Sequence, residues 1–474
     1  MKYLSFLLLL IFFIAHACNN EENSQLNQTL TKRDLPKIKE QGKLKALVTY
    51  SATSYFLYRG QPMGYEYELL QRMGESLGLD IDIEVTKDLD QMIEQLNNGK
   101  VDLIAHGLTI TTERKQKAAF TDYLYLTQQV LVQKKPDNWR KLSWAETQKS
   151  LIHDAIELIG DTVSIRKNSS YFNRIKNLSR EIGGVIHIDT LDGNLSTDEI
   201  IKMVVDGKIK YTIADENLAK INASYYPILN IDVPVSFSQR IAWAVRENSP
   251  KLKNALNKWI KKERKNAEYY VIYNKYFKNS RDFRRRVKSD FYSLNNQQIS
   301  RYDELIKQNA GKLNWDWRLL ASLIYQESRF KPKAQSWAGA KGLMQMMPAT
   351  AKEMGVKNRT NPEDNLRGGA KYLKHLYSRF DDITDSVQRI KFTMAAYNCG
   401  YYHVRDAQKL AEKKKLNTTK WDKNVEEMIL ALSYPKNYNL DFIEYGYVRG
   451  IEPYNYVNQI FKRYSHYQKF IKNT

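Results

Sequence analysis

Residues 320–351 read LASLIYQESRFKPKAQSWAGAKGLMQMMPATA, and this stretch decides how the second half of the chain is interpreted. Hydrophobic residues recur at helical spacing through Leu319–Ile324, which predicts a helix with one buried face. Glu327 follows at the edge of that face. Burial disfavours a charged carboxylate and raises its pKa, which is what a general acid working near neutral pH requires. The alternative is a surface glutamate paired with Arg329 or with a lysine.

Four separated motifs in this half of the chain follow one another in order. They are Glu327-Ser328, then Ser336 with Gly342-Leu343-Met344-Gln345, then Ala395-Ala396-Tyr397-Asn398-Cys399-Gly400, and finally Tyr456-Val457. Together they resemble the catalytic domain of the soluble-lytic-transglycosylase family, which has a lysozyme-like fold. The resemblance implies an all-α domain over residues 290–474, with no cofactor and no metal. Turns are expected after the first helix, and a second helix is expected from about Gly342.

The resemblance also implies a mechanism in which Glu327 acts twice. It first protonates the glycosidic oxygen between N-acetylmuramic acid and N-acetylglucosamine in peptidoglycan. It then accepts the proton of the muramic C6 hydroxyl, which attacks C1 and forms a 1,6-anhydro ring. Ordinary glycoside hydrolysis uses two carboxylates, and these motifs contain no second acid. A hydrolytic muramidase remains the alternative enzyme.

Five further residues are candidates for contact with the sugar. The resemblance places Ser336 at the substrate acetamido group. Gln345 and Asn398 carry amides that hydrogen-bond sugar substituents. Tyr397 and Tyr456 are expected to orient Glu327 or to offer flat faces to sugar rings, and packing in the core is the alternative for both tyrosines.

Length and charge limit the number of domains and the kinds of binding partner. The chain has 474 residues, enough for two or three domains, and a formal net charge of +21. A nucleic-acid partner is not expected, because the basic residues are spread over the chain and no zinc-finger, basic-zipper or RNA-recognition signature is present. Peptidoglycan, which carries carboxylates on its peptide stems, is an anionic polymer that fits the charge equally well. Charge alone does not choose between these partners.

The amino terminus has the pattern of a secretory signal. In residues 1–18, Lys2 precedes an apolar run that is too short to span a bilayer comfortably. Residues 15–18, AHAC, resemble a bacterial lipoprotein cleavage box, which implies that Cys18 is lipidated. An ordinary signal with an incidental cysteine is the alternative. Residues 19–37 are polar and predict a tether. The resemblance implies a location at the periplasmic face of the outer membrane, either lipid-anchored or peripheral.

Residues 38–279 alternate between strand and helix patterns, which predicts parallel sheets covered by helices. The strands are expected at 44–50, 80–85, 101–105, 162–166, 185–188 and 210–214. The phrase GKVDLIA at 99–105 is echoed by GKIKYTIA at 207–214, which indicates two similar lobes. Residues 249–277 are expected to be helical, and the basic segment 280–289 is expected to be a solvated linker. Contact of its arginines with lipid head groups or glycan stems is the alternative.

This first domain resembles the family 3 extracellular solute-binding proteins, which are periplasmic amino-acid receptors. The matching residues are Gly64, Glu68, Gly99, Asp102, Thr111–Arg114, Phe120-Thr121, Ser169-Ser170 and Asp215. The resemblance implies that Arg114 clamps a ligand carboxylate through two parallel hydrogen bonds and that Asp215 holds an ammonium group. A surface or capping arginine and a helix N-cap aspartate are the alternatives.

The expected fold is therefore multidomain, with a two-lobed α/β periplasmic-binding-protein-like domain followed by an all-α lysozyme-like domain. Asp122–Tyr125 departs from the receptor pattern, so the expected ligand is an amino acid or a muropeptide that the domain senses. A non-catalytic solute-binding lipoprotein is the alternative outside the enzymes.

Overall fold

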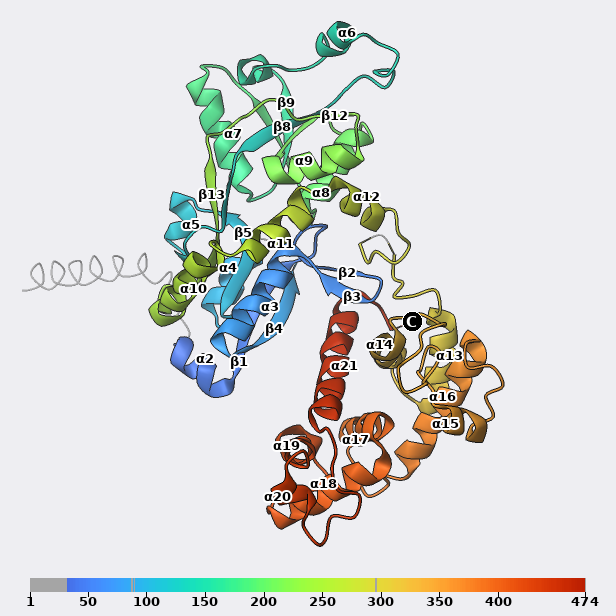
Figure 1. Cartoon of the computed structure of the whole chain (residues 1–474). Helices are drawn as coiled ribbons and strands as arrows, with labels where there is room; N and C mark the ends of the chain where they lie inside the picture. Colours follow the sequence, from blue (N-terminus) through green and yellow to red (C-terminus); the bar gives the residue numbers. More distant parts are fainter. Residues whose placement is uncertain (1–31, 87, 89, 295, 474) are drawn as a thin grey trace, which may run out of the picture. The chain divides into compact units, whose positions relative to one another are not determined.

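A computed structural model describes residues 32–473 except 87, 89 and 295, and the chain divides into two compact units (Figure 1). The first unit runs up to Ser54 and continues from Tyr65 to Ser280. The second unit combines Tyr55–Gly64 with Arg281–Thr474. The predicted signal, Cys18 and most of the predicted tether lie outside the described residues. Among the described residues, no helix combines the length and the apolar character needed to cross a bilayer.

One sheet organises the first lobe of the first unit. Its strand order is β4-β1-β5-β13-β6, and β7 also pairs with β13. The pairs β1–β4 and β1–β5 are parallel, as predicted, whereas β13 is antiparallel to β5. The strands are β1 (Lys43–Thr49), β4 (Asp80–Thr86), β5 (Leu103–Thr109), β6 (Ala119–Phe120), β7 (Tyr125–Thr127) and β13 (Gln239–Val245), and the helices are α2 (Leu35–Gln41), α3 (Tyr65–Leu77), α4 (Asp90–Asn97), α5 (Thr112–Lys115), α10 (Pro250–Glu263) and α11 (Ala267–Phe277).

The second lobe contains two smaller sheets around their own hydrophobic core. One sheet is antiparallel in the order β11-β8-β12, and the other is the parallel pair β10-β9. The core includes Leu131, Val163, Ile175 and Ile213. The elements are β8 (Gln129–Lys134), β9 (Thr162–Arg166), β10 (His187–Leu191), β11 (Tyr211–Asp215), β12 (Leu229–Asn230), α6 (Trp144–Gln148), α7 (Ser170–Glu181), α8 (Thr197–Val205) and α9 (Glu216–Tyr225).

The first unit begins earlier than the sequence indicated. Arg33, assigned to the tether, pairs with the buried carboxylate of Asp102 at 2.7 Å. Asp34 caps α2, and its carboxylate also accepts hydrogen bonds from the backbone N–H groups of Lys251 and Leu252. These interactions make residues 33–37 part of the folded domain and not a tether.

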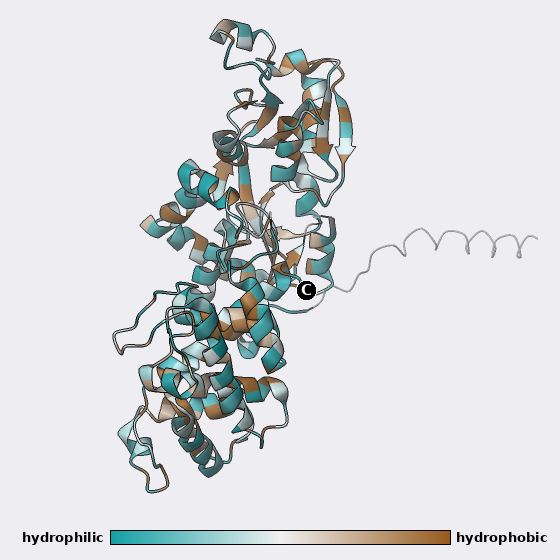
Figure 2. Cartoon of the chain, turned by 90° about the vertical axis from the view of Figure 1, so that its right-hand side faces the viewer, coloured by the Kyte–Doolittle hydropathy of each residue, from teal (hydrophilic) through white to brown (hydrophobic). Residues whose placement is uncertain are grey.

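Helices dominate the second unit, as predicted, and Figure 2 shows their hydrophobic residues alternating with hydrophilic ones. The centre of the fold is α17, in which Phe392–Ala396 are buried. The helices are α12 (Ser280–Val287), α13 (Asp303–Leu313), α14 (Trp317–Ser328), α15 (Pro348–Glu353), α16 (Pro362–Ser378), α17 (Ser386–Cys399), α18 (Tyr401–Lys413), α19 (Glu426–Ala431), α20 (Pro435–Tyr438) and α21 (Ile451–Phe470).

Two expectations about helices were wrong. The second helix after Glu327 does not open near Gly342, because residues 329–347 form a loop and α15 begins at Pro348. Residues 280–287 form α12, in which Phe283 is buried, so this segment is not a solvated linker. The stretch 249–277, expected to be helical, forms the two helices α10 and α11, which confirms that expectation.

A β-hairpin from early in the chain belongs to the second unit. It comprises β2 (Phe56–Tyr58) and β3 (Gln61–Met63), and the sequence did not reveal it. Its anchor is Tyr55, a fully buried side chain whose hydroxyl hydrogen-bonds Nδ1 of His466 in α21. The hydroxyl of Tyr467 donates to the backbone oxygen of Gly60 at 2.7 Å. The hairpin is therefore built into the packing of α21.

Candidate active site

Helix α14 presents Glu327 at its carboxyl end. The helix begins behind Asp316, whose carboxylate accepts a hydrogen bond from the backbone N–H of Arg318 at 2.9 Å. Leu319–Ile324 are buried, which confirms the predicted apolar face. The helix stops because Arg329 and Phe330 both adopt left-handed φ values, 50° and 57°. Such backbone conformations cost about 1–3 kcal/mol each in non-glycine residues and cluster at functional sites.

Glu327 is partly buried and has a defined hydrogen-bond partner. The hydroxyl of Tyr456, which is buried, donates to Oε1 of Glu327. Burial raises the pKa of Glu327 from 4.5 to about 7, and the hydrogen bond from Tyr456 opposes that rise. Among the described residues, no second carboxylate contributes to this shift. Near neutral pH the side chain therefore populates both its acidic and its basic form.

The pairing of α14 with α21 holds Tyr456 opposite Glu327. The hydroxyl of Ser322 donates to the backbone oxygen of Ile460 at 2.7 Å. Arg463 donates from Nη2 to Oε1 of Gln326 at 2.9 Å and from Nη1 to the backbone oxygen of Ser322 at 3.2 Å. Hydrogen bonds between α14 and α21 thus fix Glu327 and Tyr456 opposite each other.

The loop after Glu327 is closed by its own hydrogen bonds. The hydroxyl oxygen of Ser336 accepts the backbone N–H of Ala340 at 3.0 Å. Gln345, with a left-handed φ of 47°, donates from Nε2 to the backbone oxygens of Ala334 and Gly342 at 3.0 and 2.9 Å. The amide nitrogen of Gln345 therefore braces the loop. Contact of Ser336 and Gln345 with substrate stays a prediction.

Asn365 in α16 holds this loop from behind, and sequence reasoning missed it. Its buried amide accepts the backbone N–H of Met344 at 2.8 Å and donates to the backbone oxygens of Lys341 and Arg359 at 3.1 and 2.9 Å. Gly342 passes close to this amide with φ 91°, and a Cβ there would lie 2.0 Å from the backbone oxygen of Arg359. An asparagine inside a helical pattern gave no sequence signal for this role.

The third motif reaches the site through Tyr397. Its hydroxyl donates to the backbone oxygen of Met344 at 2.7 Å and so holds the loop, not the Glu327 carboxylate. Burial and then the charge of Glu327 raise the pKa of Tyr397, which places its ring close to the acid. Asn398 follows as an exposed residue near the end of α17. Burial raises the pKa of the Cys399 thiol to about 12, so this thiol is not a nucleophile.

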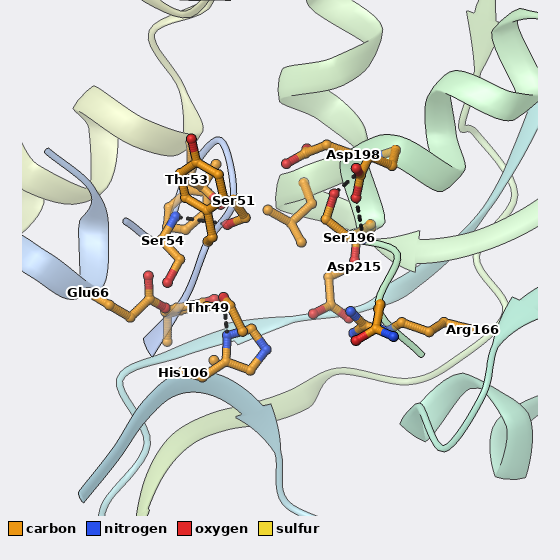
Figure 3. A pocket seen from close by; sticks show the side chains of 18 residues that line it. Thr49, Ser51, Thr53, Ser54, Glu66, His106, Arg166, Ser196, Asp198 and Asp215 are labelled. Carbon is orange, nitrogen blue, oxygen red and sulfur yellow. Dashed lines mark hydrogen bonds between the residues drawn. The ribbon is translucent and has the colours of Figure 1, made fainter. Parts of the chain in front are cut away.

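The first unit encloses a separate cavity of about 60 Å³ (Figure 3). Figure 3 shows Glu66 and His106 on one side of it and Arg166, Asp198 and Asp215 on the other. A cavity of this size holds roughly four to six waters, which is close to the volume of one amino acid. Charged side chains from both lobes line the cavity, which makes it the candidate ligand site of the first unit.

Asp215 lines this cavity, whereas Arg114 does not. Asp215 begins α9 but makes no side-chain cap, and its buried Oδ1 has no hydrogen-bond partner among the described residues. Burial raises its pKa to about 7, although a bond with Tyr171 and the nearby Arg114 and Arg166 oppose the rise. Arg114 lines a neighbouring depression, where its Nη1 donates to the backbone oxygen of Thr109 at 3.2 Å.

Arg166 and Glu66 are cavity residues that sequence reasoning did not select. Arg166 ends β9 and supplies the guanidinium in the cavity wall. Glu66 is buried in the first turn of α3, and burial raises its pKa to about 7. Asp198 is held by the backbone N–H of Ala52 at 3.2 Å and by the amide of Asn222 at 2.8 Å. Acids are common in the first turn of a helix, so the sequence did not mark Glu66.

A helical unit that presents a partly buried glutamate with a raised pKa, in a chain that also carries a two-lobed α/β unit, is the arrangement expected of a modular enzyme of the lytic-transglycosylase type. Residues 304–420 match the Transglycosylase SLT domain, and residues 37–279 match the bacterial extracellular solute-binding proteins, family 3. Membrane-bound lytic murein transglycosylase F of Desulfosudis oleivorans is 35% identical over 432 residues, which cover 91% of this chain and 91% of that relative.

The relative of the same name from Pseudomonas fluorescens strain Pf-5 is 31% identical over 435 residues, covering 91% of this chain and 85% of its own length. The chain belongs to the membrane-bound lytic murein transglycosylase F family, and it is a lytic transglycosylase. These matches confirm the predicted order of the two domains. An ancestral arginine-binding protein bound to glutamine matches 50% of this chain and 98% of its own with a TM-score of 0.42 and 23% identity. That similarity says nothing about the ligand of this chain.

Proposed function

We propose that Glu327 alone supplies both proton transfers in cleavage of the β-1,4 bond between N-acetylmuramic acid and N-acetylglucosamine. One observation carries the proposal: the pKa of Glu327 is raised to about 7 without any contribution from a second carboxylate among the described residues. A hydrolase of the common kind needs two carboxylates, one as acid and one as base or nucleophile. A lyase that uses a hydroxyl of its own substrate needs one.

The two proton transfers balance on this single group. Neutral Glu327 gives its proton to the glycosidic oxygen as the bond to muramic C1 breaks. The resulting carboxylate takes the proton of the C6 hydroxyl as that oxygen bonds to C1, which closes the 1,6-anhydro ring and regenerates the acid. Because the nucleophile belongs to the same sugar, the ring closure is intramolecular and no water is consumed. Tyr456 donates to Glu327 throughout and stabilises the charged form between the two steps.

We infer the sugar contacts from the hydrogen-bonding groups of each side chain that are not already used within the protein. The hydroxyl hydrogen of Ser336 remains available to donate, because its oxygen is what accepts the bond from Ala340. Gln345 offers its carbonyl oxygen, and the exposed Asn398 offers its amide. We assign the substrate acetamido group to Ser336 and leave the two amides for other sugar substituents.

Mass spectrometry of the muropeptides released from peptidoglycan tests the reaction. Anhydro ends are expected, whereas reducing ends would identify a hydrolytic muramidase. Glu327→Gln is expected to lower the rate on the order of 100-fold or more, as loss of a general acid does. Glu353→Gln, at an exposed glutamate of the same unit, is the matched control. An activity of Glu327→Gln within a few-fold of the wild type would contradict the assignment and favour a non-catalytic binding protein.

We also propose that the first unit senses an amino acid or the terminal residue of a muropeptide stem. The support is the cavity, with the unpartnered Oδ1 of Asp215 for an ammonium group and Arg166 beside it for a carboxylate. Arg114 acts there through its charge. Ammonium binding would drive a proton off Asp215, because an adjacent positive charge lowers the pKa of a carboxylate.

Calorimetry of the full-length protein with single amino acids and stem peptides tests this second proposal. Binding heat is expected to depend on the ionisation enthalpy of the buffer near pH 7, and Asp215→Asn is expected to remove that dependence. Absence of heat with every ligand would overturn the proposal.

We also propose that Cys18 carries a lipid that attaches the protein to the outer membrane. Loss of membrane association in Cys18→Ser tests this proposal.

A further inference from the structure

A basic depression lies on the second unit beside the loop that follows Glu327. We call it the basic groove and define it by Lys341, Lys352, Lys357 and Arg359, which contribute four cationic side chains to its wall. Its volume is about 640 Å³, and no lining residue is acidic. Ligand pockets in proteins commonly occupy about 300–1,000 Å³, so the basic groove has room for a short peptide.

The charges of the basic groove are not neutralised within the described part of the second unit. None of the four cations takes part in a salt bridge there. Asp364, close in sequence, is already engaged, because it accepts the backbone N–H groups of Lys357 and Asn358 and pairs with Arg367. Like charges gathered in a concave surface create a positive potential that attracts anions.

The wall of the basic groove is continuous with the loop that carries Ser336. Arg359 donates from Nη1 to the backbone oxygens of Gly339 and Met346 at 2.8 and 3.1 Å. The backbone of Lys341 bridges to Gln335, the residue before Ser336. The basic groove and the proposed acetamido contact therefore belong to one rigid segment.

The chemistry of the substrate connects the two. In N-acetylmuramic acid the acetamido group is on C2, and the lactyl group that bears the peptide stem is on the adjacent C3. Because the two substituents are on neighbouring carbons, we expect a sugar whose acetamido group lies at Ser336 to carry its stem near this loop. We propose that the basic groove binds the carboxylates of the peptide stem, an inference that rests on the proposed function. Ammonium and guanidinium groups suit carboxylates, which the stem carries at its γ-linked residue and at its end.

Kinetics on two substrates test the proposal. One is glycan strands with intact stems, and the other is the same strands after an amidase has removed the stems. The double variant Lys352→Glu/Lys357→Glu is expected to raise KM on stem-bearing strands roughly tenfold, since each reversal replaces an attraction by a repulsion. Its KM and kcat on denuded strands are expected to match the wild type. Lys374→Glu, at an exposed lysine of α16 outside the basic groove, is the control and is expected to change neither.

Each result decides the matter. An equal loss on both substrates would show that the substitutions damage the site generally and would overturn the proposal. An unchanged KM on stem-bearing strands would do the same, and loss of binding to anionic lipid vesicles in that case would assign the basic groove to a membrane surface. The proposed reaction is tested separately, because it fails only if the wild type does not form anhydro ends on denuded strands.

Discussion

Replacing the acid Glu327 by glutamine is expected to stabilise the second unit at alkaline pH and to leave its stability almost unchanged at acidic pH. The folded protein holds Glu327 at a pKa of about 7 instead of 4.5, so folding favours its neutral form. Glu327 therefore contributes full stability below about pH 4.5 and loses that contribution as the pH rises through about 7. Glutamine keeps the shape and accepts the hydrogen bond from Tyr456, but it does not titrate.

The raised pKa sets the size of the effect. A rise from 4.5 to about 7 is a difference of about 2.5 pKa units, and at 1.36 kcal/mol per unit this corresponds to about 3 kcal/mol. Because part of the side chain faces solvent, we expect a gain of roughly 1–3 kcal/mol above pH 8. For a domain of 150–250 residues, each kcal/mol shifts Tm by about 2–4 °C.

Scanning calorimetry of the wild type and Glu327→Gln at pH 5 and pH 8.5 measures the difference. The Tm of the second unit is expected to rise by several degrees in the variant at pH 8.5 and by much less at pH 5. The exposed Glu353→Gln substitution serves as the control and is expected to behave alike at both pH values. If the difference in Tm between Glu327→Gln and the wild type does not grow with pH, the claim that burial raises the pKa of Glu327 is wrong.

Two other substitutions test the frame around Glu327. Tyr456→Phe removes the hydrogen bond that opposes the effect of burial, so the alkaline limb of the pH–kcat/KM profile is expected to move about one pH unit upward, and an unmoved limb would contradict the pairing. Gly342 has a φ of 91°, and Gly342→Ala would bring a Cβ to 2.0 Å from a backbone oxygen. Gly339 has a similar φ of 87° but open space around it, so Gly339→Ala is the control. The Tm of Gly342→Ala is expected to fall further than that of Gly339→Ala. Backbone strain of about 1–3 kcal/mol is common to both glycines, so equal losses of Tm would show that the clash is relieved.

The parts of the site that depend on local periodicity could be predicted from the sequence. The apolar spacing before Glu327 gave both the helix and its half-buried acid, because burial of one helix face follows from the positions of its residues. The partner of that acid could not be derived in this way. Tyr456 lies 129 residues further along the chain, and its contact depends on how α21 packs against α14. The motif resemblance supplied the residue, and the structure supplied the hydrogen bond.

Sequence reasoning failed where a polar side chain serves the backbone of a distant segment. Asn365 donates its amide hydrogens to the backbone oxygens of Lys341 and Arg359, and nothing in its neighbours along the chain marks that use. In the first unit, Arg114 was selected by its motif, whereas Arg166 lines the cavity because β9 ends there. The alternation of strands and helices along the chain does not determine which strand ends line the same cavity.

The hairpin at residues 55–64 has a consequence for how the protein is made. Tyr55 and His466 are 411 residues apart, so the second unit cannot finish folding until α21, near the end of the chain, is available. At synthesis rates of about 5–20 residues per second, the hairpin waits on the order of 20–80 s for its partner helix. During that interval Phe56 and Leu57, buried in the finished protein, lack their final packing. The hairpin is therefore expected to be among the last parts of the second unit to reach its final packing, although it is among the first to be made.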